Sequence, residues 1–199
     1  MVSVDLLFVC TGNICRSPVA ERLTARWADE ALGGEAFSVG SAGTDAEVGR
    51  GIHPASAAAL VELGGNPDGF TARSLVAGEA EQAGLVLTMT RRQRHVVLRD
   101  APRAMQRCFT LPEAAELLAV ADLTGLSDLP VDERVRELPR RLAAGRRLRP
   151  SGPADDIQDP IGLTPQVHAD VAGEIARCLR PLTAVLFDDV VASAVSASA

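Results

Sequence analysis

The stretch Cys10-Thr11-Gly12-Asn13-Ile14-Cys15-Arg16-Ser17-Pro18 follows an apolar run at 4–9. It precedes residues 19–32, in which apolar positions recur at the spacing of a helix. The stretch is therefore predicted to be a loop that joins the end of a buried strand to the N-terminus of a helix. Gly12 and Asn13 suit a tightly turned backbone, and Ser17-Pro18 is typical of a helix start.

The residue types in this loop fit the binding of a dianionic, tetrahedral oxyanion. Backbone amides and the positive end of the helix dipole supply positive potential, and the planar guanidinium of Arg16 can bind two oxygens at once. The same potential favours the thiolate of Cys10, which is the form that attacks phosphorus. The alternative is that Cys10 is only a small buried residue at the end of a core strand. The glycine, the arginine and Ser-Pro at one junction favour a catalytic loop.

Strand and helix patterns alternate along the chain, which predicts a parallel sheet covered by helices on both faces. The strands are expected at about 4–9, 36–40, 85–89 and 107–111. The helices are expected at about 17–33, 54–63, 75–83, 91–98 and 165–182. Ligands of open α/β sheets bind at the carboxyl ends of the strands. Cys10 lies at such an end.

The loop resembles that of the low-molecular-weight protein tyrosine phosphatases, which reads Cys-x-Gly-Asn-x-Cys-Arg-Ser-Pro and continues with a small residue, Ala and Glu. Here the continuation is Val19-Ala20-Glu21. Further matches are Ser41-Ala42-Gly43-Thr44, the segment 85–90 and Asp159-Pro160. The resemblance covers residues 4 to about 110 and 155 to about 182. It implies a three-layer α/β/α fold with a four-stranded parallel sheet, and hydrolysis of phosphotyrosine in proteins through a phosphocysteine intermediate.

The resemblance also assigns roles within the loop. Cys10 is expected to be the nucleophile and Arg16 to bind the phosphoryl oxygens. The remaining phosphate-binding positions are expected to be Thr11, Gly12, Asn13, Ile14, Cys15 and Ser17. Ser17 is expected to donate a hydrogen bond to the Cys10 thiolate, and Asn13 to order the loop through side-chain bonds to backbone. In the resembling family a cysteine at the position of Cys15 forms a reversible disulfide with the nucleophile; a role as a small filler of the loop is the alternative.

A phosphocysteine mechanism needs an acid, because an alkoxide or phenoxide leaves poorly unless it is protonated. Segment 154–162 offers three carboxylates, those of Asp155, Asp156 and Asp159. Residue chemistry leaves all three open. The resemblance selects Asp159, because the acid of that family is the aspartate of an Asp-Pro pair. Asp155 and Asp156 are then expected to be solvated turn residues, with Asp156 as an alternative assisting carboxylate.

The chain is expected to form one domain over 1–182, with an insertion at about 112–153 relative to the family. The insertion carries helical patterns at 112–121 and 131–144 and an arginine-rich end at 146–149. It is interpreted as a solvated surface hairpin whose arginines pair with Asp132, Glu133 and Glu137, or alternatively as a lid or docking element. The tail at 183–199, which is small, polar and low in complexity from Ala192 onward, is expected to be partly disordered.

Composition narrows the function classes. The net charge of −6 argues against a nucleic-acid-binding protein, and all 20 basic residues are arginine, which excludes a Walker-type loop with its lysine. No apolar run is long enough to cross a bilayer and no signal peptide is recognisable, which predicts a cytoplasmic protein. The cysteines are too scattered for a disulfide framework. Neither metal nor cofactor is expected. The three histidines do not have metal-ligand spacing with the cysteines, and they are interpreted as surface or edge residues: His53, His95 and His168.

The expected partner is a phosphorylated protein, but the phosphorylated residue is open to two interpretations. Ile161 follows Asp-Pro where many family members carry aromatic residues, and the acidic Asp45 and Glu47 would suit a cationic guanidinium. The alternative function is therefore a protein arginine phosphatase, a branch of the same family. That branch has a threonine where this chain has Ile14, which favours phosphotyrosine.

Arsenate reductase is a further alternative, because it shares this fold and loop. Its thioredoxin-coupled form needs two additional cysteines close together after the third strand. Cys108 and Cys178 are far apart in the sequence, which makes this function the least favoured of the three. The sequence gives no indication of oligomeric state.

Overall fold

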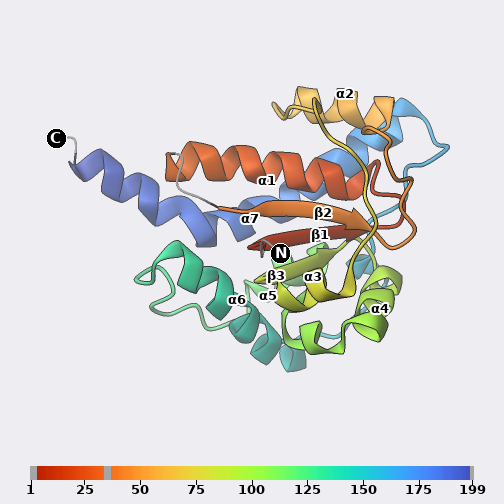
Figure 1. Ribbon diagram of the computed structural model, residues 1–199. Helices are drawn as coiled ribbons and strands as arrows, with labels where there is room; N and C mark the ends of the chain where they lie inside the picture. The colour runs from red at the N-terminus through yellow and green to blue at the C-terminus, as the bar shows by residue number, and fades with distance from the viewer. Residues whose placement is uncertain (1–3, 34–36, 198–199) are drawn as a thin grey trace.

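A computed structural model describes residues 4–33 and 37–197, with side chains up to residue 187 (Figure 1). Its centre is one four-stranded sheet in the order β2-β1-β3-β4, with every pair parallel. The strands are β1 (Leu6–Cys10), β2 (Val39–Gly43), β3 (Leu85–Thr88) and β4 (Cys108–Thr110). The predicted α/β class with a four-stranded parallel sheet between helical layers is confirmed.

The sheet is buried on both faces because alternate side chains of each strand point to opposite sides. In β1, Leu6, Phe8 and Cys10 belong to the larger core, while Leu7 and Val9 belong to the smaller one. The helices that contribute to the larger core are α1 (Arg16–Leu32), α2 (Pro54–Glu62), α5 (Leu111–Leu117), α6 (Val131–Gly145) and α7 (Pro165–Ala197). The smaller core is covered by α3 (Ala77–Gln82), α4 (Arg91–Asp100) and the 3₁₀ helix η1 (Pro102–Arg107). Figure 1 shows α1 and α7 on one side of the sheet and α3 and α4 on the other.

The second strand lies later in the chain than predicted. It was expected at 36–40, but β2 runs from Val39 to Gly43, and residues 34–36 lie outside the described part. The residues Ser41-Ala42-Gly43 have little intrinsic strand preference, yet they pair with β1 up to the register Cys10↔Gly43. A Cβ at Gly43 would lie 2.4 Å from the carbonyl oxygen of Thr11. Glycine therefore allows the end of β2 to approach the loop that follows Cys10.

The insertion at 112–153 is not the solvated hairpin that was predicted. Its helices are α5 and α6, followed by η2 (Arg146–Leu148) and η3 (Pro153–Asp155), and Leu138 and Leu142 of α6 are fully buried in the larger core. Arg146 donates to Glu113 at 2.8 Å and lies over the ring of Phe109. The predicted pairing of the insertion's arginines is confirmed in part, because Arg136 pairs with Asp132 and Arg141 with Glu137. The arginine at the end of the insertion, Arg149, instead pairs with Glu116 and Asp155.

The last helix is longer than predicted. It was expected to end near 182, before a partly disordered tail, but its backbone is helical from Pro165 to Ala197. Leu182, Leu186 and Phe187 are buried in the larger core, so the apolar spacing that began at Val171 continues past the expected end. Residues 198 and 199 lie outside the described part. None of the described helices is long and apolar enough to cross a membrane.

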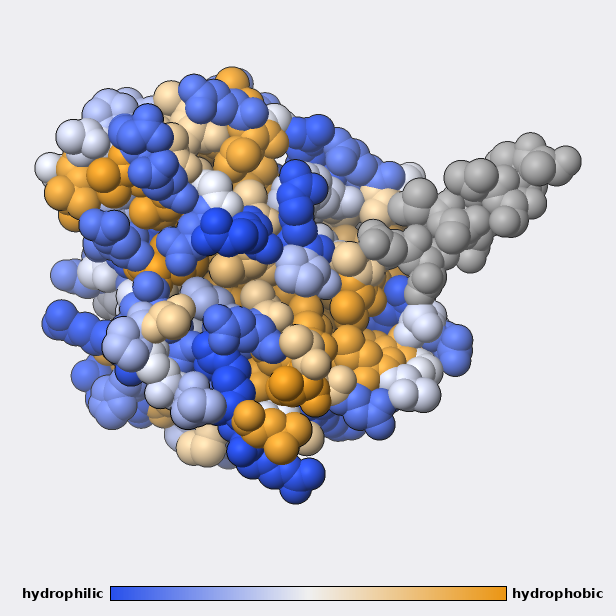
Figure 2. Space-filling view, turned by 180° about the vertical axis from the view of Figure 1, so that it is seen from behind, coloured by the Kyte–Doolittle hydropathy of each residue, from blue (hydrophilic) through white to orange (hydrophobic). Residues whose placement is uncertain are grey.

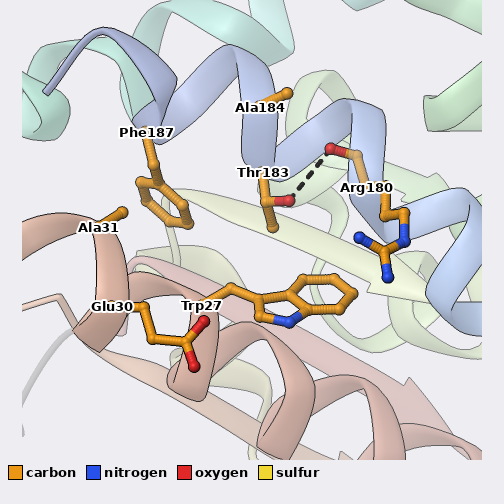
Figure 3. Close-up of a pocket in the computed structure, with 7 residues that line it drawn as sticks. All are labelled: Trp27, Glu30, Ala31, Arg180, Thr183, Ala184 and Phe187. Carbon is orange, nitrogen blue, oxygen red and sulfur yellow. Dashed lines mark hydrogen bonds between the residues drawn. The ribbon is translucent and has the colours of Figure 1, made fainter. Parts of the chain in front are cut away.

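The face opposite to that of Figure 1 is a mosaic of charged and hydrophobic side chains (Figure 2). A cavity of about 550 Å³ lies between α1 and α7 and is lined by Trp27, Glu30, Ala31, Arg180, Thr183, Ala184 and Phe187 (Figure 3). Its polar groups have partners in the protein: Glu30 binds Arg26, Arg180 lies over the ring of Trp27, and Thr183 donates back to its own helix. This cavity holds no nucleophile, so the candidate site lies elsewhere.

Candidate active site

The loop between β1 and α1 directs its amides to one side. Four of its carbonyl oxygens accept hydrogen bonds from backbone amides of segment 44–53, at 2.7–3.0 Å: those of Cys10, Thr11, Gly12 and Ile14. In a planar trans peptide the next N–H points away from the carbonyl. The amides that follow these carbonyls therefore point to the opposite side of the loop, and that of Asn13 donates to Cys10 Sγ at 3.3 Å. This arrangement of donors around a thiol can bind an oxyanion.

Asn13 orders the loop from behind. It is fully buried and has the left-handed φ of 55°. Its Nδ2 donates to Ser17 Oγ at 2.9 Å and to Ser41 Oγ at 2.8 Å, and its Oδ1 accepts from the amide of Arg73 at 2.9 Å. The predicted bond to backbone is confirmed by the Arg73 amide. The bonds to the Ser17 and Ser41 hydroxyls were not predicted. These three bonds maintain a backbone conformation that is otherwise unfavourable for a residue other than glycine.

Ser17 is placed to stabilise the charged form of Cys10. Its Oγ lies 3.0 Å from Cys10 Sγ, and it already accepts a hydrogen bond from Asn13. A hydroxyl has one proton to donate, and with Asn13 as a donor that proton is free for the sulfur. The geometry therefore matches the predicted direction of this hydrogen bond.

Arg16 and Asp159 meet although they are far apart in the sequence. Arg16 Nη2 lies 2.5 Å from Asp159 Oδ2, and Nη1 donates to the carbonyl oxygen of Ile157 at 3.1 Å. The Arg16 side chain is 4% exposed and that of Asp159 is 45% exposed. The amide of Ile157 in turn donates to the carbonyl of Met89 at 2.8 Å. The loop that carries Asp159 is thus fixed to the end of β3.

These residues line one cavity of about 240 Å³. Its lining consists of Cys10, Thr11, Gly12, Ile14, Cys15, Arg16, Asp45, Glu47, Asp159 and Ile161. The structure therefore brings together the expected nucleophile, cation and acid, together with four of the six expected phosphate-binding positions. Asn13 and Ser17 lie behind the loop and are fully buried. Their contacts support the loop and the sulfur.

The interpretation of Asp155 and Asp156 as solvated turn residues is wrong. The side chain of Asp155 is 1% exposed; it accepts from Ser151 at 2.7 Å and pairs with Arg149. Asp156 accepts from the amide of Arg91 at 2.6 Å and from its guanidinium at 2.8 Å. Burial alone would raise the pKa of each carboxyl, but these hydrogen bonds outweigh it and hold both pKa values below the usual range. Both carboxylates anchor the loop that carries Asp159.

Gln93 was missed by the sequence reasoning. This buried residue of α4 accepts from the amide of Met89 at 3.0 Å and donates to Thr11 Oγ1 at 3.1 Å. It therefore links the end of β3 to the loop between β1 and α1. The only sequence signal is a polar residue on the buried side of a short helix, which does not reveal its partners.

The interpretation of the histidines as surface or edge residues holds for His95, which is exposed, and is wrong for His168, which is 1% exposed. His168 stacks on half-buried His53 with the ring centroids 4.6 Å apart. One potential ligand atom from each of these histidines and from Cys15 lies within 4.8 Å of the others. Burial raises the pKa of the Cys15 thiol to about 11 despite a hydrogen bond with Ser56. Cys15, His53 and His168 are far apart in the sequence, but their side chains lie close together beside the loop between β1 and α1.

Comparison with known proteins finds similarity to phosphatases. A family model described as low molecular weight phosphotyrosine protein phosphatase matches residues 5–123. The tyrosine phosphatase Wzb of Escherichia coli K12 is 37% identical over 98 residues, which are 49% of this chain and 63% of that protein. The protein-arginine-phosphatase of Bacillus subtilis is 35% identical over 112 residues, which are 55% of this chain and 71% of that protein.

A solved structure of the arginine phosphatase YwlE superposes with a TM-score of 0.64 at 27% identity, covering 89% of this chain and 92% of that one. It is a cysteine-to-serine variant whose active-site serine is phosphorylated. The match to the Escherichia coli relative spans under two thirds of that relative's length. The comparisons therefore identify the relatives of the chain, whereas its substrate has to be argued from the cavity.

Proposed function

Because the chain belongs to the low molecular weight phosphotyrosine protein phosphatase family, we propose that it hydrolyses phosphotyrosine in protein substrates through a phosphocysteine intermediate. The observation that carries the proposal is the position of Cys10 Sγ, which lies between the Ser17 hydroxyl at 3.0 Å and the Asn13 amide at 3.3 Å. Arg16 and Asp159 line the same cavity.

In the first step the Cys10 thiolate attacks phosphorus, the S–P bond forms and the P–O bond to the leaving group breaks. Arg16 exchanges Asp159 for two phosphoryl oxygens, which a planar guanidinium can bind together. Asp159, released from Arg16, takes up a proton from solvent and gives it to the departing phenoxide, which leaves as the phenol. In the second step Asp159 accepts a proton from water, the hydroxide attacks phosphorus and the S–P bond breaks. Ser17 stabilises the thiolate that leaves.

The cavity walls favour an aryl substrate. Ile14 and Ile161 both line the cavity and offer apolar contact to a phenol ring. The carboxylate of Glu47 is already paired with Arg50, which weakens its attraction for a cationic substrate. These features support phosphotyrosine over phosphoarginine.

Protein arginine phosphatase is the second candidate. Asp45 is exposed at the cavity wall, and no ion pair occupies it within the described residues. A carboxylate in this position can attract a guanidinium. The Bacillus subtilis relative at 35% identity also keeps this function open.

Arsenate reduction by a thiol relay finds little support. Burial raises the pKa of Cys108 to about 12 and that of Cys178 to about 11. Neither thiol is therefore a ready nucleophile at neutral pH, and they lie on different elements, β4 and α7. For the location we propose the cytoplasm, because all four cysteines are free thiols, which suits a reducing compartment.

The test is a panel of substrates with the purified chain: an aryl phosphate, phosphotyrosine and phosphoarginine peptides of matched sequence, and arsenate with a thiol donor. We expect the highest kcat/KM for the phosphotyrosine peptide. Cys10→Ser is expected to abolish turnover and still bind vanadate, because the amides and Arg16 remain. A variant that retains more than about a hundredth of the wild-type rate would show that Cys10 is not the nucleophile. Preference for phosphoarginine would establish the second candidate instead.

A further inference from the structure

Three side chains that bind borderline-soft metal ions converge behind the phosphate-binding loop. Cys15 precedes α1, His53 precedes α2 and His168 lies in the first turn of α7. One donor atom from each residue lies within 4.8 Å of the other two. Cys15 is 4% and His168 1% exposed. Thiolate and imidazole are the donors that zinc prefers, and here they come from three separate elements.

Two nitrogens of this cluster are poorly paired. His53 Nδ1 and His168 Nε2 are buried without a well-formed hydrogen bond among the described residues. The backbone carbonyl of Pro160 lies close enough to the His168 ring to interact with it, and this carbonyl would give way to a metal ion. Buried polar atoms are normally paired, because an unpaired one keeps the cost of its lost hydration. The other nitrogen of the His168 ring, Nδ1, lies 2.8 Å from Ser56 Oγ. Such an outer contact fixes the orientation of a metal-binding imidazole, and it leaves Nε2 for a further ligand.

We propose that Cys15, His53 and His168 form a binding site for a zinc ion, with water as the fourth ligand. Binding breaks the S–H bond of Cys15, the proton passes to solvent, and the sulfur lone pair bonds to the metal. The two neutral imidazoles each contribute a nitrogen lone pair. The charged groups acting on the Cys15 thiol are Cys10 and Asp159, which favour a cation, and Arg16, which opposes it.

The site requires a small rearrangement. Zinc bonds to nitrogen and sulfur measure about 2.0–2.3 Å, so donors up to 4.8 Å apart must move closer. The two rings are stacked at an interplanar angle of 9°, and one ring has to tilt to point its lone pair at the same ion as the other. His53 is only half-buried, which makes it the ring with room to turn.

Occupancy of this site would have consequences for the neighbouring loop. The amide of His53 donates to the carbonyl of Ile14 at 2.7 Å, and Cys15 itself lines the catalytic cavity. A bound ion would join the phosphate-binding loop, segment 44–53 and α7 through one centre. It would also hold Cys15 as a metal thiolate, which is then not available to form a disulfide with Cys10.

The experiment uses the full chain with Cys10→Ser, so that the catalytic sulfur cannot be the ligand. The protein is freed of metal with a chelator and titrated with Zn²⁺ in competition with a chromophoric chelator. We expect one equivalent to bind. In this background Cys15→Ala and His53→Gln are expected to weaken binding by more than about 100-fold, since loss of an outer-sphere partner alone costs 10–100-fold. The same titration with Co²⁺ is expected to show a thiolate charge-transfer band that Cys15→Ala removes.

Matched controls are Cys178→Ser and His95→Gln, which change a half-buried cysteine and an exposed histidine outside the cluster. Both are expected to bind Zn²⁺ like the parent. Circular dichroism of the metal-free variants shows whether each is folded. If Cys15→Ala does not fold, the test rests on His53→Gln, which changes a half-buried residue. The proposal is overturned if the Cys10→Ser chain binds no stoichiometric Zn²⁺, or if folded His53→Gln binds it as tightly as the parent does.

Discussion

Arg16 and Asp159 bind each other directly, with Nη2 and Oδ2 2.5 Å apart. The phosphoryl group and Asp159 therefore compete for the same guanidinium. In the proposed mechanism, substrate binding frees the Asp159 carboxylate, which can then take up the proton that it passes to the leaving group. The ion pair thus couples occupation of the phosphate site to the availability of the acid.

The contacts of Arg16 predict that lysine cannot replace it. The guanidinium reaches Asp159 with one nitrogen and Ile157 with another, whereas an ammonium is a point charge without this fork. Arg16→Lys is expected to lower kcat/KM for an aryl phosphate by roughly 10²–10³-fold, the usual cost of losing an oxyanion donor. Arg16→Ala serves as the comparison. If the lysine variant keeps most of the wild-type activity, positive charge alone is sufficient and the two-pronged contact is unimportant.

For Asp159 the prediction concerns the leaving group. Asp159→Asn is expected to slow hydrolysis of a poor leaving group by about 10²–10⁴-fold, because a general acid contributes that much, and to slow that of an activated phenol far less. Rates measured over a series of aryl phosphates test this. The matched variant is Asp156→Asn, whose carboxylate is bound to Arg91 and which should leave the dependence on the leaving group unchanged. An equal loss for all phenols in Asp159→Asn would rule out the acid role.

Ile14 is predicted to set the preference between phosphotyrosine and phosphoarginine. Its side chain lines the catalytic cavity, where an apolar contact gains with a phenol ring and gives nothing to a guanidinium. Ile14→Thr is expected to shift the ratio of kcat/KM values toward the phosphoarginine peptide, and Ile14→Val to preserve it. An unchanged ratio in the threonine variant would assign selectivity to another part of the wall, such as Asp45.

Asp155 is predicted to contribute pH-dependent stability. Its pKa lies below the usual range of an aspartate in the folded protein, because its hydrogen bonds outweigh the effect of burial. The folded state therefore binds fewer protons, and the contribution is fully present above about pH 4 and lost as the pH falls through the folded value. Asp155→Asn is expected to lower the free energy of unfolding at pH 7 by about 2–3 kcal/mol.

Thermal unfolding from pH 7 to pH 2 measures this effect, and the difference between wild type and Asp155→Asn should shrink at the acid end. Asp132→Asn is the control, because its partner Arg136 is exposed and such surface pairs contribute little. A difference that stays constant down to pH 2 would mean that the carboxylate charge is not what stabilises the loop.

The parts of the molecule that the sequence predicted well depend on local patterns. The nucleophile loop could be predicted because a short apolar strand, a run of phosphate-binding residue types and an amphipathic helix follow one another without a gap. The parallel sheet and its two helical layers could be predicted because strand and helix patterns alternate along the chain. The second strand was misplaced because Ser41, Ala42 and Gly43 have small side chains, and only pairing with β1 makes them a strand.

The parts that were missed depend on contacts between distant segments. His168 bonds to Ser56 across 112 positions and stacks on His53, and no spacing rule brings these residues together. Asp155 and Asp156 looked like turn residues because their partners, Arg149 and Arg91, are recognisable only in the fold. The insertion was misjudged for the same reason, since Leu138 and Leu142 become core residues only when α6 packs against the sheet layer.

Four carbonyls of the loop between β1 and α1 accept from backbone amides of residues 44, 45, 47 and 53, and the side chains of Asp45 and Glu47 take no part in these bonds. The side chains at Asp45 and Glu47 can therefore be exchanged without loosening the anion cradle, provided that no proline removes an amide. Chimaeras that carry this short segment from a relative of different selectivity should keep their chemistry while changing which phosphorylated residue they accept. The side of the cavity formed by Asp45 and Glu47 can thus vary while the backbone that surrounds Cys10 stays the same.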